Sequence, residues 1–309
     1  MTGNELLQLF RQGGKRSLLI GNENNGVIAG LDLEGRLYFV YNGEVINRVN
    51  TAAVLGITTR KGYLNPGGDG LWPAPEGTCY GYQYATGSWR VPPGLAYARF
   101  LETAPGVIEA EVELINAQGI GLPTLFRRMV ELDHQANTMT VKVTESIRYL
   151  GAQTWTADKI MLAPWTLCQF DCTPDCEVVF PATKPEDVWD LYDPSDDQRY
   201  RDGALIRTHN STTSRYQLGL AAPIAWIELR HPGKQLKVRR SALALPPDRH
   251  YIDIADAPPQ TQPSPRGVCY SIYSDPAGFM EIEATGGAAN ELTPGLELSV
   301  TVITTIDRL

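Results

Sequence analysis

The sequence predicts an all-β protein: a large antiparallel β-sandwich with a short N-terminal helix. After the first residues, hydrophobic side chains recur mostly with a period of two, in about fifteen short runs separated by turn-forming residues. So many strands need two broad sheets packed face to face, and 309 residues that are 43% hydrophobic can bury the core between them. The sequence shows no repeat of fixed period, which argues against a propeller or a solenoid. We therefore expect one domain spanning residues 1–309.

The first part of the chain is expected to form a helix followed by short strands. Residues 4–12 (NELLQLFRQ) have the spacing of an amphipathic helix. Asn42-Gly43, between the runs YFVY and EVINRV, is the strongest hairpin signal in the chain. The strands expected in this part are residues 17–20, 27–31, 36–41 and 44–49.

The remaining chain also has the pattern of strands. Val107–Ile115 alternates cleanly, with Ile108, Ala110, Val112 and Leu114 on one face. Residues 181–202 and 258–265 are polar or proline-rich connectors, and neither is a domain boundary because strand-like sequence resumes after each. Further strands are expected at residues 122–132, 138–149, 159–170, 216–220, 224–229, 236–243, 251–254, 267–273, 279–284 and 296–306.

The charge balance restricts the partners. The formal net charge is −8 and the sequence pI is about 5.1, which disfavours nucleic acid and anionic membranes because both require a basic face. The opening MTGNELLQLFRQGGKRS is too polar for a secretory signal and no later stretch could span a bilayer, so a cytoplasmic location is expected.

No cofactor is expected. The spacing of Cys168, Cys172 and Cys176 fits no standard zinc or iron–sulfur pattern, and an odd total of five cysteines argues against a disulfide scaffold. The glycine clusters are not followed by helices, so no phosphate cradle for a nucleotide or flavin is predicted.

One stretch near the start, Tyr63–Gly77 (YLNPGGDGLWPAPEG), has the composition of a shaped loop. Its prolines fix φ and remove backbone donors, and it shows neither a helical nor a strand period. Asp69, Trp72 and Glu76 would stand on this rigid support, where an aromatic face beside carboxylates suits a sugar. The alternative is an ordinary proline-rich loop whose Trp fills the core.

A late strand carries two acids on one face. Glu281 and Glu283 alternate within residues 279–284, whose other positions are mostly apolar. An unpaired buried charge is costly, so these carboxylates should face solvent, a cleft or each other. The alternative for Glu281 is a solvated edge strand.

An aromatic and basic segment follows the proline-rich stretch. Tyr80, Tyr82 and Tyr84 alternate, and Arg90 comes soon after them. On a strand, the three phenols would share one face and could stack on sugar rings, and Arg90 could hold a carboxylate or phosphate. The alternative is an aromatic ladder that seals a sheet.

Three segments in the same order resemble the galactose mutarotase-like (aldose 1-epimerase) superfamily. Gly67–Glu76 (GGDGLWPAPE) is similar to the GG-x-x-LWPAPE signature of uncharacterised bacterial members. Ala163–Gln169 (APWTLCQ) resembles the central strand, which carries a histidine in that family. Gly278–Glu283, followed by LTPG at residues 292–295, is similar to the C-terminal acidic strand and its turn.

The resemblance implies an all-β fold, the antiparallel β-supersandwich of that family, and sugar mutarotation as the activity. Such enzymes use a Glu as the base that takes the anomeric proton and a His as the acid that protonates the ring oxygen. Glu281 matches the basic glutamate, but Cys168 and Gln169 occupy the region of the family histidine. His209, in the polar segment RTHNSTTS, is then the candidate acid. The residues expected to bind the sugar are Asp69, Trp72, Glu76, Arg90, Gln169 and Glu283.

Three hypotheses remain open for the function. The first is a mutarotase-like enzyme acting on a sugar or glycan end. The second is a carbohydrate-binding protein that has lost the acid, which the missing central-strand histidine favours. The third is a structural sandwich without a ligand, which the grouped Asp, Trp and Glu of the proline-rich stretch disfavour.

Overall fold

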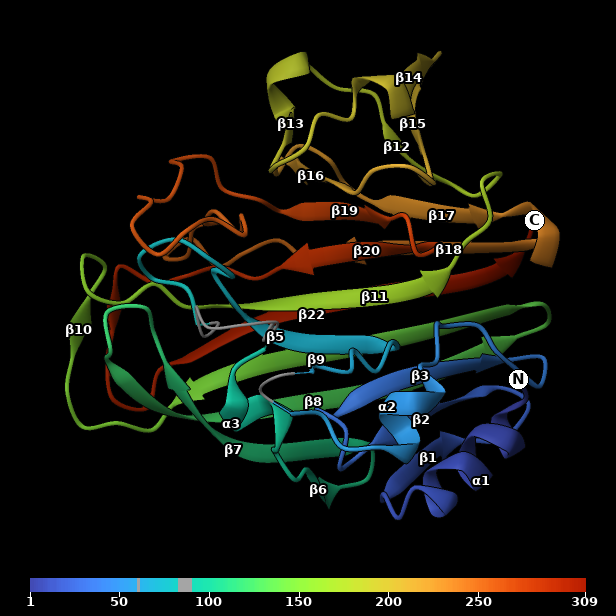
Figure 1. The fold of residues 1–309 in the computed structure, drawn as a ribbon, viewed down its shortest axis with the longest axis horizontal. Helices are drawn as coiled ribbons and strands as arrows, with labels where there is room; N and C mark the ends of the chain where they lie inside the picture. Colours follow the sequence, from blue (N-terminus) through green and yellow to red (C-terminus); the bar gives the residue numbers. More distant parts are fainter. Residues whose placement is uncertain (60–61, 83–90) are drawn as a thin grey trace.

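The computed structural model describes residues 1–59, 62–82 and 91–309. Within these ranges, two ten-stranded sheets and one two-stranded ribbon account for the strands, and every pairing of named strands is antiparallel. Figure 1 shows the strands of the two sheets crossing the molecule in layers. The predicted antiparallel β-sandwich with an N-terminal helix is confirmed.

The first sheet positions the candidate site. Its central strands come from distant parts of the chain: β5, β11, β20 and β19 are consecutive neighbours in the sheet. In order across the sheet, the strands are β1 (Ser17–Gly21), β2 (Gly26–Gly30), β3 (Arg36–Tyr41), β5 (Asp69–Ala74), β11 (Ala163–Asp171), β20 (Phe279–Thr285), β19 (Tyr270–Asp275), β16 (Tyr216–Leu220) and β13 (Val188–Asp190), with β4 (Glu44–Val45) paired to β3.

The second sheet closes the other side of the core. Its long strands alternate buried and exposed residues, as expected for a sheet with one solvated face. In order, they are β14 (Arg199–Asp202), β15 (Leu205–His209), β12 (Glu177–Pro181), β17 (Ile227–His231), β18 (Leu236–Ala242), β22 (Glu297–Arg308), β9 (Thr138–Tyr149), β8 (Gly121–Gln135), β7 (Val107–Ile115) and β6 (Leu101–Ala104). The small ribbon pairs β10 (Trp155–Thr156) with β21 (Glu291–Leu292).

Helices are few and short in the described residues. The predicted N-terminal helix is α1 (Gly3–Gln12), which starts at a capping box formed by Thr2 and Glu5 and lies beside β1 and β2 (Figure 1). No helix of the described residues is long and apolar enough to cross a membrane. The other helical turns are α2 (Thr51–Leu55), α3 (Pro93–Ala96), η1 (Pro185–Asp187), η2 (Asp196–Gln198) and η3 (Pro232–Lys234).

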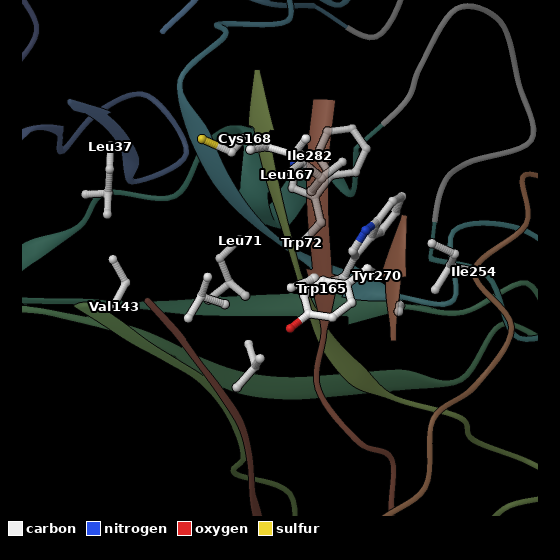
Figure 2. Packing of buried hydrophobic residues seen from close by; sticks show 14 of the residues in the cluster. Leu37, Leu71, Trp72, Val143, Trp165, Leu167, Cys168, Ile254, Tyr270 and Ile282 are labelled. Carbon is white, nitrogen blue, oxygen red and sulfur yellow. The ribbon is translucent and has the colours of Figure 1, made fainter. Parts of the chain in front are cut away.

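The apolar core lies between the sheets. Leu71 and Ile282 from the first sheet and Val143 from the second belong to one cluster of buried side chains (Figure 2). Trp72 and Trp165 extend this cluster on the other face of the first sheet. This arrangement buries the apolar face of each sheet, which is the main source of stability in such a fold.

Four buried charges also connect the two sheets. Asp69 on β5 lies 3.5 Å from both Arg128 on β8 and Arg240 on β18, and Arg128 pairs with Glu145 on β9. Thr166 donates a hydrogen bond of 2.7 Å to Asp69. Because each of the four is at most 1% exposed, their mutual pairing offsets the cost of desolvation.

Several predicted strands have the predicted bounds, namely β3, β7, β9 and β16. The hairpin at Asn42-Gly43 is also confirmed: both residues have positive φ, of 51° and 84°, and join β3 to β4. These segments were readable because period-two burial and turn chemistry are local properties.

The prediction that the proline-rich stretch is a loop is wrong for part of it. Residues 69–74 are not a loop but strand β5, and all six are buried, so no alternation marks them. Pro73 is tolerated because β3 pairs with β5 only at Asp69, so most of that edge of β5 needs no donor.

Two other strand predictions also fail. Residues 251–254 form no strand, and Asp253 there accepts backbone hydrogen bonds from Ala255 and Ser264, which compete with ladder pairing. The expected strand 44–49 ends at Val45. Conversely, the expected connector 181–202 contains β13 and β14.

Candidate functional site

An open cavity of about 200 Å³ lies against the first sheet, on the side away from the second sheet. Its lining residues are Tyr63, Asn65, Trp72, Glu76, Trp165, Leu167, Tyr192, Arg215, Gln217, Asp256, Tyr273, Asp275, Phe279, Glu281 and Glu283.

Strand alternation explains which side chains reach the cavity. On β20, Phe279, Glu281 and Glu283 share one face and line it, whereas Met280 and Ile282 belong to the core. The pairing register then places Gln169 of β11 opposite Glu281, and Tyr273 of β19 on its other side. The cavity is therefore built from five neighbouring strands of one sheet.

Aromatic rings form one wall. Trp72 and Trp165 lie directly opposite each other on β5 and β11, with ring centroids 5.9 Å apart in an edge-to-face arrangement. Tyr63 lies 6.5 Å from Trp72. The Trp72 indole is 6% exposed, and its Nε1 has no hydrogen-bond partner among the described residues. Such a wall can take the apolar face of a ring.

Two carboxyl groups lie side by side in the cavity. Glu283 is held by two donors: Trp165 Nε1 at 3.0 Å and Gln217 Nε2 at 3.1 Å, both to Oε2. Glu281 hydrogen-bonds Glu283 and is the more accessible of the two, with 5% of its surface exposed against 1%. Glu283 is thus fixed, and Glu281 is the member that a ligand can contact.

Both carboxyl groups have raised pKa values. Burial raises the pKa of Glu281 well above its ordinary value, and the charge of Glu283 raises it further. Burial also raises the pKa of Glu283, but hydrogen bonds from Glu281, Trp165 and Gln217 favour its charged form and oppose that shift. The pair therefore retains a proton at a pH where free glutamates have none, so it can both donate and accept one.

The opposite wall carries polar groups of both signs. Arg215 lies over the ring of Tyr192, with its Cζ 4.7 Å from the centroid. Tyr273 donates a hydrogen bond of 2.6 Å to Asp275. These groups can hold hydroxyls on the side of a ligand away from the tryptophans.

Four of the residues proposed from the sequence lie together in this cavity: Trp72, Glu76, Glu281 and Glu283. Asp69 does not join them. It lies three residues before Trp72 on the same strand, so it points to the opposite face and into the charged network between the sheets. Its burial and pairing indicate a structural role.

The remaining proposed residues lie elsewhere. Gln169 is 1% exposed and does not line the cavity, although its Nε2 donates to the lining residue Asn65 at 3.1 Å. His209 ends β15 of the second sheet, where it stacks on Tyr200 at 5.6 Å, and it does not line the cavity. Arg90 and Tyr84 are outside the described residues.

The sequence reasoning missed most of the lining. Trp165 shares a strand face with Gln169, so the alternation that selected Gln169 also pointed to Trp165. Arg215, Gln217 and Tyr273 had no such signal, because only the order of strands in the sheet brings β16 and β19 beside β20. The described residues contain no group of three or more His, Cys, Asp or Glu side chains placed to hold a metal ion.

No protein-family model and no curated protein matches the chain. Solved structures do match it over nearly its whole length. The Slr1438 protein from Synechocystis sp. PCC 6803 superposes with a TM-score of 0.54 at 12% identity, covering 95% of this chain and 96% of that one. A galactose mutarotase-like protein from Lactobacillus casei ATCC 334 also gives 0.54, at 11% identity, covering 94% and 100%.

A galactose mutarotase related enzyme from Lactobacillus acidophilus gives a TM-score of 0.50 at 11% identity, covering 95% of this chain and 97% of that one. At such identities the similarity establishes the fold. The chain has the galactose mutarotase-like fold, as the resemblance of its motifs predicted.

Proposed function

We propose that the cavity binds a pyranose sugar and interconverts its two anomers by general acid–base catalysis. The main observation in support of this proposal is that one cavity contains both an aromatic wall and two neighbouring carboxyl groups that share a hydrogen bond. Ring opening requires that the anomeric hydroxyl lose a proton while the ring oxygen gains one. A carboxyl pair that holds one proton can meet both needs.

The proposed roles follow from position. Trp72 stacks on the C–H face of the sugar, and Glu76 accepts hydrogen bonds from its hydroxyls. Glu281 takes the acid–base position, because it is the more accessible of the two paired carboxyl groups. Two of the solved structures with this fold are described as galactose mutarotase-like or related, and this similarity of fold supports a sugar as the ligand.

A second candidate is a carbohydrate-binding protein without catalysis. All four histidines lie in the described residues, and none lines the cavity. The histidine acid of the resembled family is therefore missing, and a cavity without a replacement for it would bind a sugar and leave its anomers unchanged.

The experiment is exchange NMR or polarimetry on freshly dissolved α-glucose and α-galactose. We expect the protein to speed mutarotation of at least one sugar, and Glu281→Gln to reduce the rate to that of the solution alone. Glu291→Gln, a change at an exposed position on β21, serves as the matched control and should keep the wild-type rate. Binding without acceleration would establish the second candidate instead, and an unchanged rate in Glu281→Gln would remove Glu281 from its role.

A further inference from the structure

We propose that Glu281 enters the reaction protonated and acts as both acid and base, while Glu283 is a positioning residue that keeps it protonated. This inference rests on the proposed mutarotation. Glu281 itself supplies the proton that the missing histidine would give, and the second carboxyl group keeps Glu281 protonated.

The cavity itself leaves Glu281 as the best-placed proton donor. Arg215 does not release a proton near neutral pH, and burial raises the pKa of both Tyr192 and Tyr273, so neither phenol ionises readily. Glu281 lines the cavity and is hydrogen-bonded to a neighbouring carboxylate, which is the arrangement that keeps a carboxylic acid neutral.

Glu283 is suited to remain the charged member. Its Oε2 accepts from both Trp165 and Gln217, and two N–H donors on one oxygen favour the ionised form. Neither donor can give up its proton at neutral pH. The fixed negative charge next to Glu281 then opposes ionisation of Glu281.

Other charged groups also face this pair. Arg36 from β3 favours ionisation of Glu281, whereas Glu76, which follows β5, opposes it. Tyr273 lies opposite Glu281 on β19, and Asp275 lines the cavity from the same strand. The remaining titratable groups of the lining are Tyr63, Tyr192, Arg215 and Asp256. The balance of burial and these charges still raises the pKa of Glu281.

The proposed exchange is cyclic and balanced. The O–H bond of Glu281 breaks as its proton moves to the ring oxygen, and the bond between that oxygen and the anomeric carbon breaks with its electron pair going to the oxygen. The anomeric O–H bond breaks at the same time, its proton moves to the other carboxyl oxygen of Glu281, and a C=O double bond forms. Glu281 ends protonated again, and after rotation of the aldehyde the reverse exchange closes the ring.

The first test is the pH–rate profile of mutarotation. If the protonated form of Glu281 is active, the rate falls about tenfold per pH unit above its pKa. Glu283→Gln removes the neighbouring negative charge but keeps an oxygen for Trp165 and Gln217, so the fall should begin about one pH unit lower. A rate that rises through this range, as a carboxylate base would give, or an unmoved profile in Glu283→Gln, overturns the inference.

The second test does not depend on activity. Burial also raises the pKa of Glu145, to about 7, so Glu281 is identified by the infrared difference between wild type and Glu281→Gln. This difference should show one protonated carboxyl group near neutral pH, whose band Glu283→Gln shifts to lower pH and the control Glu291→Gln leaves in place. Absence of the band overturns the inference and leaves the proposed function standing. A band without any mutarotation overturns the proposed function, and with it the catalytic role of Glu281.

Discussion

The protonation of Glu281 should be visible in the stability of the protein. The folded state holds this proton through a pH range in which the unfolded chain, with a glutamate pKa of about 4.3, has already released it. The stabilising contribution of Glu281 is therefore fully present below that value and is lost as pH rises towards the raised folded pKa. Where the folded state binds one proton more than the unfolded state, the free energy of unfolding falls by about 1.4 kcal/mol for each unit of pH increase.

Replacing Glu281 with Gln removes this pH dependence, because the amide has the same size as the carboxyl group but does not ionise. From about pH 5 upward, the variant should gain about 1.4 kcal/mol relative to wild type for each pH unit, until the folded pKa is reached. The amide of the variant can still donate a hydrogen bond to Glu283, as the protonated Glu281 does, so the charged form of Glu283 keeps this partner in both proteins.

Urea unfolding at a series of pH values measures this difference directly, provided that the m-values of the two proteins agree. Near pH 4 the two proteins should differ little in this respect, and the gap should open above it. Parallel stability curves across the range would refute the reasoning, because they would mean that Glu281 titrates alike in the folded and unfolded states.

Three further predictions concern other parts of the structure. Asp69→Asn should lower the free energy of unfolding in urea by about 3 kcal/mol, because it removes a charge from a buried network. The control Glu131→Gln, at an exposed pair with Lys142, should lower it by less than about 1 kcal/mol. Equal losses in the two variants would contradict the role given to the network. Trp72→Ala should weaken sugar binding about tenfold in calorimetry. Trp226→Ala, at a tryptophan outside the cavity, should leave the affinity unchanged. Equal affinities of the two variants would remove Trp72 from the site. Thr2→Ala should cost about 1 kcal/mol locally and speed amide exchange in α1 about fivefold, and unchanged exchange would show that the capping box contributes nothing.

Local patterns were sufficient to predict much of the fold. Val107–Ile115 shows its strand because one face is buried and the other is solvated. Asp69–Ala74 does not show it, because both faces of β5 are covered and its prolines have the composition of a loop. A strand buried on both faces carries no alternation for the reader of a sequence to find.

The candidate site depended on information that a sequence does not carry. Glu281 and Glu283 were found because two acids on an otherwise apolar strand need an explanation, and the structure shows them paired with each other. Asp69 was placed wrongly beside Trp72, because its direction depends on β5 being a strand. The contributions of β16 and β19 followed only from the strand order.

The most direct test of the account is a crystal structure of the protein with α-galactose or α-glucose. The account predicts electron density for the sugar in the cavity on the first sheet, with one ring face against Trp72 and the anomeric oxygen within hydrogen-bonding distance of Glu281. A sugar bound elsewhere, or an empty cavity at a concentration that saturates binding in solution, would contradict it.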